Sequence, residues 1–396
     1  MDDRRAIAQL HRLMRWLEAF KECFGHRAQQ LALRRYVQGL LSDRARKSME
    51  TILARMTEPG AYQAFQHFIT DAPWSADRVW RRLRAILPER KGLLIIDGTS
   101  FPKQGKHSVG VARQYCGALG KVASCQVAVT AALWTGVRTY LLGAALYLPE
   151  EWLSETARAR VRISAAVRFQ EKWRLTLTLL RQVRASGITV TGVLADAELG
   201  DDTLFRTLLH RLRLPYAVGV SSSQTVFLGR PRLVPPPRSR LGRPHTRPTL
   251  PAGVQAATVA AVAAAQPRWR RISWRNRCAA RNWTVECVAL RVTPAHDWRQ
   301  QGRLVPDAWL LSERDTCDTP QTKHYFVHLP ATASWLRLVP LAHQRWAIEQ
   351  QYRELKTDLG LDHCDGRTFP GWHHHVVLTA LTYNFPKPSA DGSSRD

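Results

Sequence analysis

The first 90 residues show apolar side chains at the spacing of amphipathic helices. Basic residues lie among them, on the polar sides of the predicted helices. The apolar positions that carry the pattern are Leu13, Trp16, Leu17, Phe20, Tyr36, Leu40, Leu41, Trp80, Leu83 and Ile86. We therefore predict a helical segment over residues 1–90. Two interpretations fit it: a plain helical bundle with solvated basic faces, and a DNA-recognition module.

From Gly92 onward the pattern changes to short apolar runs that are typical of buried strands. The run Leu93–Ile96 ends in Asp97, and the run 188–195 ends in Asp196. The other predicted elements are strands over about 107–115, 123–133, 139–148 and 216–220, one long Arg-rich helix over about 151–186, and a helix near 203–212. Alternating strands and helices predict an α/β core.

The second half of the chain starts with residues 229–267, which are rich in Pro, Arg and Ala and predict a mobile loop. Short β-like runs return between about 268 and 328, so we expect a β-rich insertion there. Helices resume at about 334 and include 372–383, and the tail from Pro386 is expected to fray.

Charge favours a polyanionic partner. Lys and Arg number 58 against 32 Asp and Glu, a formal net charge of +26. Such an excess repels itself in a compact chain and is well suited to phosphates, which release counterions when they are neutralised. A basic but otherwise ordinary enzyme from an Arg-rich proteome is the alternative.

The composition also indicates in which cellular compartment the protein works. The seven cysteines are scattered and form no CxxC pair, which argues against a disulfide framework and a structural zinc site. We find no signal peptide and no apolar run of the roughly 18–20 residues that a membrane span needs. We expect a reduced, cytoplasmic protein with no membrane partner.

Three acids are candidates for one metal site. Asp97 and Asp196 each follow a predicted buried strand, and strand ends open onto the site crevice of an α/β sheet. A single such aspartate is commonly a turn or cap residue, but two together favour a hard cation such as Mg²⁺. Glu349 lies on a predicted helix where Arg345, Arg353 and Lys356 fall within about 40° of it. An ordinary salt-bridged face is the alternative for that stripe.

These residues belong to longer blocks that resemble bacterial insertion-sequence transposases of the DDE class. The blocks, in order, are 97–121 with 125–129, then 196–200, then 345–349 with Lys356, 360–363 and 371–375. The likeness covers roughly residues 14–383. The chain departs from the family pattern at Gly98, where a second acid is often found, at Leu199 and Ala342, where Tyr is usual, and after Phe385.

The resemblance implies a ribonuclease-H-like mixed-sheet core with a β-rich insertion and an N-terminal helical domain. It makes Asp97, Asp196 and Glu349 the catalytic metal ligands, for two Mg²⁺ ions with Mn²⁺ as a possible substitute. It makes Arg345, Arg353 and Lys356 contacts to DNA. The implied divisions are a helical DNA-binding domain at 1–90, the first part of the catalytic core at 91–223, the loop and insertion at 224–330, the C-terminal core helices at 331–385 and the tail at 386–396.

Further DNA contacts are suggested by position. Lys103 and Lys106 follow the first strand, with solvated hairpin residues as the alternative. Arg268 and Arg270 begin a run of cations and aromatics suited to phosphates and bases. Trp298 could hold an extruded base, with core packing as the alternative. The triplet His373–His375 does not suit one metal ion, because adjacent helical positions point about 100° apart; packing or polar surface is expected.

Two-metal chemistry on phosphodiesters needs carboxylates and no nucleophilic side chain. We therefore predict a DNA transposase that cleaves transposon ends and joins them to target DNA. Its partner is double-stranded DNA, it works as a homodimer or higher oligomer on paired ends, and it is bacterial and nucleoid-associated. The alternatives are a catalytically inactive DNA-binding regulator and a plain metal-dependent nuclease.

Overall fold

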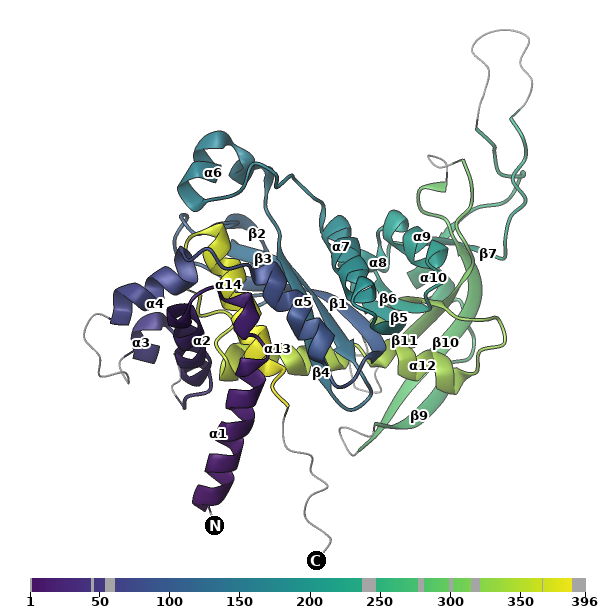
Figure 1. The fold of residues 1–396 in the computed structure, drawn as a ribbon. Coiled ribbons are helices and arrows are strands. Elements are labelled where there is room, and N and C mark those ends of the chain that lie inside the picture. Colours follow the sequence, from purple (N-terminus) through teal and green to yellow (C-terminus); the bar gives the residue numbers. More distant parts are fainter. Residues whose placement is uncertain are drawn as a thin grey trace, which may run out of the picture.

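The computed structural model describes residues 2–43, 46–53, 61–236, 247–276, 281–298, 302–314, 321–364 and 366–386. The helices before the insertion are α1 (Asp2–Glu18), α2 (Arg27–Leu40), α3 (Met49–Leu53), α4 (Ala61–Thr70), α5 (Ala76–Ile86), α6 (Glu155–Val161), α7 (Lys172–Ala185), α8 (Ala197–Gly200) and α9 (Thr203–Arg211). The later helices are α10 (Val259–Ala264), α12 (Trp335–His343), α13 (Trp346–Arg353) and α14 (Phe369–Tyr383). The strands are β1 (Lys91–Pro102), β2 (Ala112–Cys116), β3 (Lys121–Trp134), β4 (Thr139–Leu146), β5 (Thr189–Ala195), β6 (Tyr216–Val220), β7 (Thr225–Leu228), β8 (Ala257–Thr258), β9 (Arg270–Asn276), β10 (Arg281–Pro294), β11 (Ala308–Arg314) and β12 (Thr322–His328). Figure 1 labels most of these elements.

Within the described residues the strands form one twelve-stranded sheet in the order β2-β3-β1-β5-β6-β12-β11-β10-β7-β8, with β4 beside β3 and β9 beside β10. β1 is antiparallel to β3 and parallel to β5, which is parallel to β6. The series β4-β3-β1-β5-β6 is the strand order of a ribonuclease-H-like core, and the predicted mixed-sheet α/β class is confirmed. Because β12 pairs with β6, the strands of the expected insertion lengthen the core sheet. The division into domains stays a prediction.

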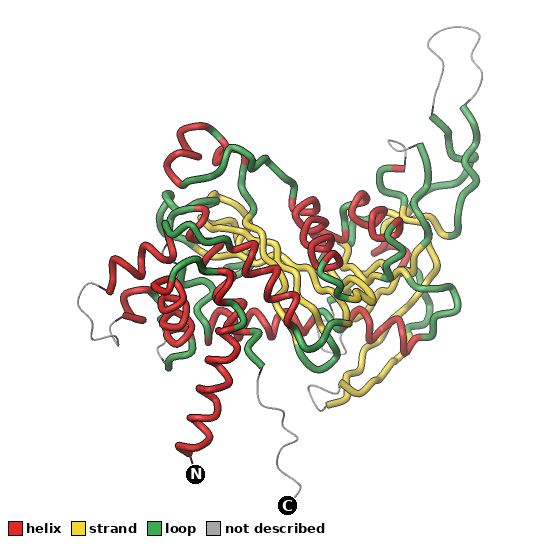
Figure 2. Tube along the Cα trace, in the orientation of Figure 1, coloured by secondary structure: helices red, strands yellow, loops and turns green. Residues whose placement is uncertain are grey.

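Different helices cover the two faces of the sheet (Figures 1 and 2). On one face Leu94 and Ile96 of β1 pack with α7, α9 and α10. On the other face Ile95 of β1 and Leu194 of β5 pack with α12 and α13. Side chains alternate along a strand, so Asp97 follows Ile95 onto the face of α12 and α13. The apolar pattern of β1 thereby decides which helices the aspartate meets.

The N-terminal helices share a core with the end of the chain. Side chains of α1, α2, α4 and α5 pack in one apolar cluster with α14 and β4. Trp16 donates its indole N–H to the backbone oxygen of Leu381 at 3.1 Å. The predicted helices are therefore present, and they are joined to the C-terminal helix and to the sheet. No helix in the described ranges is long and apolar enough to cross a membrane.

The prediction of one long helix over 151–186 is wrong. A short 3-10 turn and α6 form first, and α7 begins only at Lys172. Ser154 starts α6 by accepting a hydrogen bond from the backbone N–H of Ala157, and Arg162 ends it with a left-handed φ of 58°. Arginine is a good helix former, so the Arg-rich composition concealed this break.

The predicted mobile loop is also wrong for part of its length. Thr258 caps α10 by accepting from the N–H of Ala261, and Val259 and Val262 pack in the core beside α7 and α9. Residues 237–246 of that predicted loop, and 387–396 of the predicted tail, lie outside the described residues. Of the strand predicted over 107–115, residues 112–115 form one, within β2 (Ala112–Cys116).

Candidate active site

Asp97 and Asp196 lie on neighbouring strands. β1 and β5 pair in parallel with Ile96 opposite Ala195, so the next residue of each is an aspartate. Asp196 ends its strand as predicted and caps α8, where its carboxylate accepts from the N–H of Leu199 at 3.2 Å. The prediction that Asp97 ends its strand is wrong, because β1 continues along β3 to Pro102. Asp97 is nevertheless open toward β5, which stops beside it.

The turn after Asp196 depends on Gly200. A Cβ atom on Gly200 would lie 1.7 Å from the backbone oxygen of Gly219 on β6. Real Cβ atoms never come that close, so α8 can lie on β6 only because residue 200 is glycine. This close approach fixes where the aspartate emerges from the sheet.

Arg345 joins the third acid to this end of the sheet. Its guanidinium contacts Asp97 Oδ1 at 3.1 Å through Nη1 and Glu349 Oε1 at 3.5 Å through Nη2. Asp97 is buried, whereas the Glu349 side chain is 67% exposed. The hydroxyl of Tyr352 donates to the backbone oxygen of Asp97 at 3.2 Å and lies 2.6 Å from Thr130 Oγ1. Helix α13 is thus held against β1 at the aspartate.

The charges at this site are incompletely balanced. Burial, together with the charges of Asp196 and Glu349, raises the pKa of Asp97 to about 7 even though Arg345 opposes the shift. Burial also raises the pKa of Asp196. Burial would lower the pKa of Arg345, but the surrounding carboxylates outweigh it and the pKa is raised. A further cation here would relieve repulsion between the acids.

The donor set fits a hard metal ion by its chemistry. Carboxylate oxygens are the ligands that Mg²⁺ prefers, and Asp97, Asp196 and Glu349 would supply them. In the described part of the chain, however, no group of three or more His, Cys, Asp or Glu side chains is already arranged around a metal position. The guanidinium of Arg345 lies between two of the three acids and takes the cation's part.

The predicted single stripe of cations around Glu349 is wrong beyond Arg353. Helix α13 ends there and a π-helical segment, Glu354–Asp358, follows, so an angle of about 100° per residue no longer applies. Lys356 turns to β1, where its ammonium donates to Ser100 O at 3.1 Å and lies 5.4 Å from the ring centre of Phe101. Arg353 is exposed.

The other predicted DNA contacts are dispersed. Lys103 donates to the backbone oxygen of Cys364 at 2.7 Å, and Lys106 is exposed. Arg268 and Arg270 are exposed at the start of β9. Trp298 is 8% exposed and packs edge-on against Phe227, so most of its ring is already covered. The structure does not gather these residues at the acids.

The histidine triplet serves packing, as one of its two interpretations predicted. His374 stacks on Trp74 with ring centres 3.7 Å apart. His375 lies 2.6 Å from the hydroxyl of Tyr36. The two rings join α14 to the N-terminal helices.

Sequence reasoning missed Tyr352 and Glu198. Glu198 forms an ion pair with Lys172, and a Cβ atom on Gly98 would lie 3.8 Å from Glu198 Oε2. Its carboxylate therefore lies beside the position where a second acid at residue 98 would start. Spacing offered a signal for Tyr352, which is three residues after Glu349 on one helix. Residues two apart on a helix do not face each other, so spacing offered none for Glu198.

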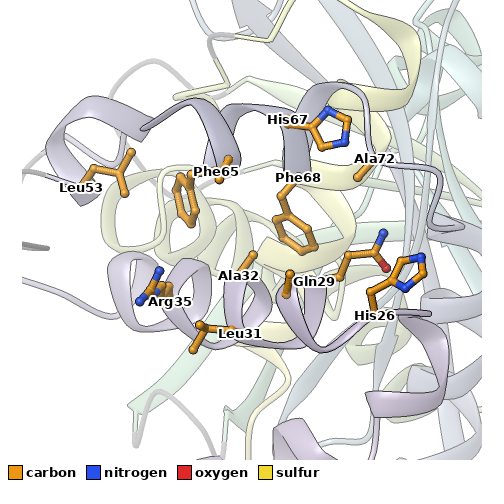
Figure 3. Close-up of a pocket in the computed structure, with 12 residues that line it drawn as sticks. His26, Gln29, Leu31, Ala32, Arg35, Leu53, Phe65, His67, Phe68 and Ala72 are labelled. Carbon is orange, nitrogen blue, oxygen red and sulfur yellow. The ribbon is translucent and has the colours of Figure 1, made fainter. Parts of the chain in front are cut away.

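An apolar pocket of about 390 Å³ lies elsewhere, between α2 and α4 (Figure 3). Phe65 and Phe68 of α4 face Leu31 and Ala32 of α2 across it. The described residues that line it include no acid, so they offer no carboxylate for metal-assisted chemistry.

Comparison with known proteins identifies a relative and a family. Over 193 residues the chain is 32% identical to a protein of Microchaete diplosiphon described as a probable transposase for insertion sequence element IS701. The match covers 48% of this chain and 48% of that protein, so the chain spans about half the length of the curated relative it matches. Residues 19–281 match the family model for DDE superfamily endonucleases, a range that contains Asp97 and Asp196 and ends before Glu349. Since that match spans more than half of its residues, the chain belongs to the DDE superfamily endonuclease family.

Proposed function

We propose that this protein is a metal-dependent DNA transposase that cleaves the ends of an insertion sequence and joins them to target DNA. The observation that carries the proposal is the pairing of Arg345 with both Asp97 and Glu349, beside Asp196 on the next strand. Family membership and the relative described as a probable transposase support it.

Asp97, Asp196 and Glu349 are the proposed ligands of two divalent ions, Mg²⁺ or Mn²⁺. When bound, such ions activate the attacking oxygen and stabilise the leaving oxygen of a phosphodiester. The protein's own part is to hold three carboxylates where β5 ends beside β1. Tyr352 fixes the backbone of Asp97, and Arg345 offers a planar pair of donors that suits a phosphate as well as a carboxylate.

The remaining predicted cations are proposed to hold DNA without reading its sequence. Arg353, Lys106, Arg268 and Arg270 are exposed and can reach phosphates directly. Lys103 and Lys356 each donate to a backbone oxygen and would keep that bond while attracting the polyanion. For Trp298, stacking on an extruded base requires its cover against Phe227 to open. Two ends processed together imply a homodimer or a higher oligomer.

The test is cleavage of duplexes that carry the element's own ends, with Mg²⁺ or Mn²⁺. Glu349→Gln and Asp196→Asn are compared with wild type and with Glu354→Gln, an acid on the following turn of the same helical stretch. We expect both site variants to bind DNA and lose cleavage and joining, while Glu354→Gln keeps them.

Other outcomes select the alternatives. Binding without cleavage by wild type under either metal would identify a DNA-binding regulator. Cleavage that never yields a joined product would identify a nuclease. Full activity in Glu349→Gln would refute the assignment of the third ligand.

A further inference from the structure

A cationic groove of about 490 Å³ lies between the β2–β3 hairpin and α6. Three exposed cations line it: Lys106, Arg113 and Arg160. Glu151 is the acid among its lining residues, so the groove carries an excess of positive charge. Arg113 and Arg160 were not among the residues that the sequence singled out.

The groove lies on the same face of the sheet as Asp97. Thr130 of β3 is directly opposite Asp97, and Gln126 is opposite Phe101. Ser124, which lines the groove, is six residues from Thr130 along β3, and alternate side chains of a strand share a face. At about 3.3 Å per residue, the groove is about 20 Å from the aspartate.

This separation can be expressed as a length of duplex DNA. Each strand of the duplex advances about 3.4 Å per nucleotide along the axis, so 20 Å corresponds to about six base pairs. Arg160 is also directed into place, because its guanidinium lies 5.4 Å from the ring centre of Trp152. The Trp152 indole is held in turn by the backbone oxygen of Val111 at 3.0 Å.

We propose that the groove of Lys106, Arg113 and Arg160 binds the sugar-phosphate backbone of duplex DNA about six base pairs from the phosphate at Asp97. The position relative to the cut rests on the proposed function, whereas the backbone contact itself does not. Backbone binding needs cations and no sequence-specific partner, which is what the lining provides.

The first test measures the salt dependence of binding to a 30-base-pair duplex of arbitrary sequence, without metal ions, by fluorescence anisotropy. In K106A/R113A/R160A the slope of log K against log salt should become shallower by about 2–3, near 0.9 for each lost phosphate contact. When the salt is raised from 50 to 200 mM, the fold-loss of affinity should therefore be about 40 times smaller for the variant than for wild type. An unchanged slope would overturn the proposal.

The matched control removes the same charge from the opposite face. The variant R168A/R174A/R181A removes three arginines from a second cationic groove along α7, the helix that packs on the other side of the sheet. We expect its slope to change by less than about one. An equal change in both triple variants would show a general effect of net charge and would overturn the assignment. Thermal melting checks that both variants fold.

The second test locates the contact. A single uncharged methylphosphonate is moved along a duplex of the element's end. Wild type should lose affinity when the substitution is about six nucleotides from the cut, and the groove variant should not; equal losses would overturn the position. Failure of wild type to cleave would count against the proposed function and would leave the metal-free slopes unaffected.

Discussion

Asp97 and His375 are both buried titratable groups, and they differ in how their polar atoms are satisfied. The hydroxyl of Tyr36 meets His375 Nδ1, and Nε2 lies 3.1 Å and 3.2 Å from the backbone oxygens of Gly360 and Leu361. A neutral imidazole accepts the first bond and donates the second, and burial lowers the pKa of His375 to about 4. Asp97 has the ion pair with Arg345, but burial, together with the charges of Asp196 and Glu349, outweighs that partner and raises the pKa of Asp97 to about 7. A completed hydrogen-bond set marks architecture, whereas unbalanced buried charge marks a candidate site.

The largest expected effect is on the acid side of this comparison. Asp97→Asn should lower the cleavage rate by more than about a thousand-fold, since a lost metal ligand costs several kcal/mol in the transition state and about 1.4 kcal/mol corresponds to a factor of ten. The same variant should melt on the order of 2–5 °C higher than wild type at pH 8 without metal, because a disfavoured buried charge is gone. Glu349→Gln, at an exposed position, should leave the melting temperature unchanged.

The sign of the pH dependence follows from the raised pKa. The Asp97 carboxyl binds a proton more tightly when folded than at its ordinary value of 3.8. This tighter proton binding stabilises the folded state. The stabilisation is complete below pH 3.8 and is lost as the pH rises through about 7. The melting difference between Asp97→Asn and wild type should therefore grow with pH over that window. A difference that shrinks as the pH rises would contradict the interpretation.

The second effect is on the histidine side. His375→Ala should lower the free energy of unfolding by about 2–4 kcal/mol, because it leaves a cavity and unpaired buried groups. Cleavage per folded molecule should stay near wild type. Since the folded pKa is depressed from 6.5 to about 4, the stabilisation by His375 is complete above pH 6.5 and is lost as the pH falls through about 4, opposite in sign to Asp97. Denaturant titrations from pH 4 to pH 8 measure how the stabilisation by His375 and by Asp97 changes with pH.

The smallest expected effect concerns Tyr352, a residue that supports the candidate site without being one of its acids. Tyr352 contacts Asp97 only through the backbone oxygen, so it positions the site and touches no reacting atom. Tyr352→Phe should lower the cleavage rate about tenfold, in the range seen for supporting residues around metal sites, and should weaken Mn²⁺ binding measured by calorimetry. Thr130→Val removes the other partner of the hydroxyl and should act in the same direction. A loss of activity with unchanged Mn²⁺ affinity would show that Tyr352 does not act through Asp97.

The strand pattern predicted much of this arrangement, because apolar runs before Asp97 and Asp196 decide both the strands and their faces. The pairing of Arg345 with Asp97 was beyond sequence reasoning, since it depends on how α13 docks on β1. The π-helical segment was missed because it changes the turn angle without any proline or glycine inside it. The broken helix at 151–186 was missed because no proline or glycine marks residues 162–171, the non-helical segment that follows α6 and starts at the left-handed Arg162.

The strand order separates the two aspartates from the segment between β6 and β12. The chain leaves the core after Val220 in β6 and returns in β12, where His324 is the register partner of Val220. The segment between Val220 and His324 therefore starts and finishes at adjoining positions on two neighbouring strands. The pairing of β1 with β5, which brings Asp97 and Asp196 together, uses none of the residues between Val220 and His324, so a change in that segment leaves the pairing itself in place.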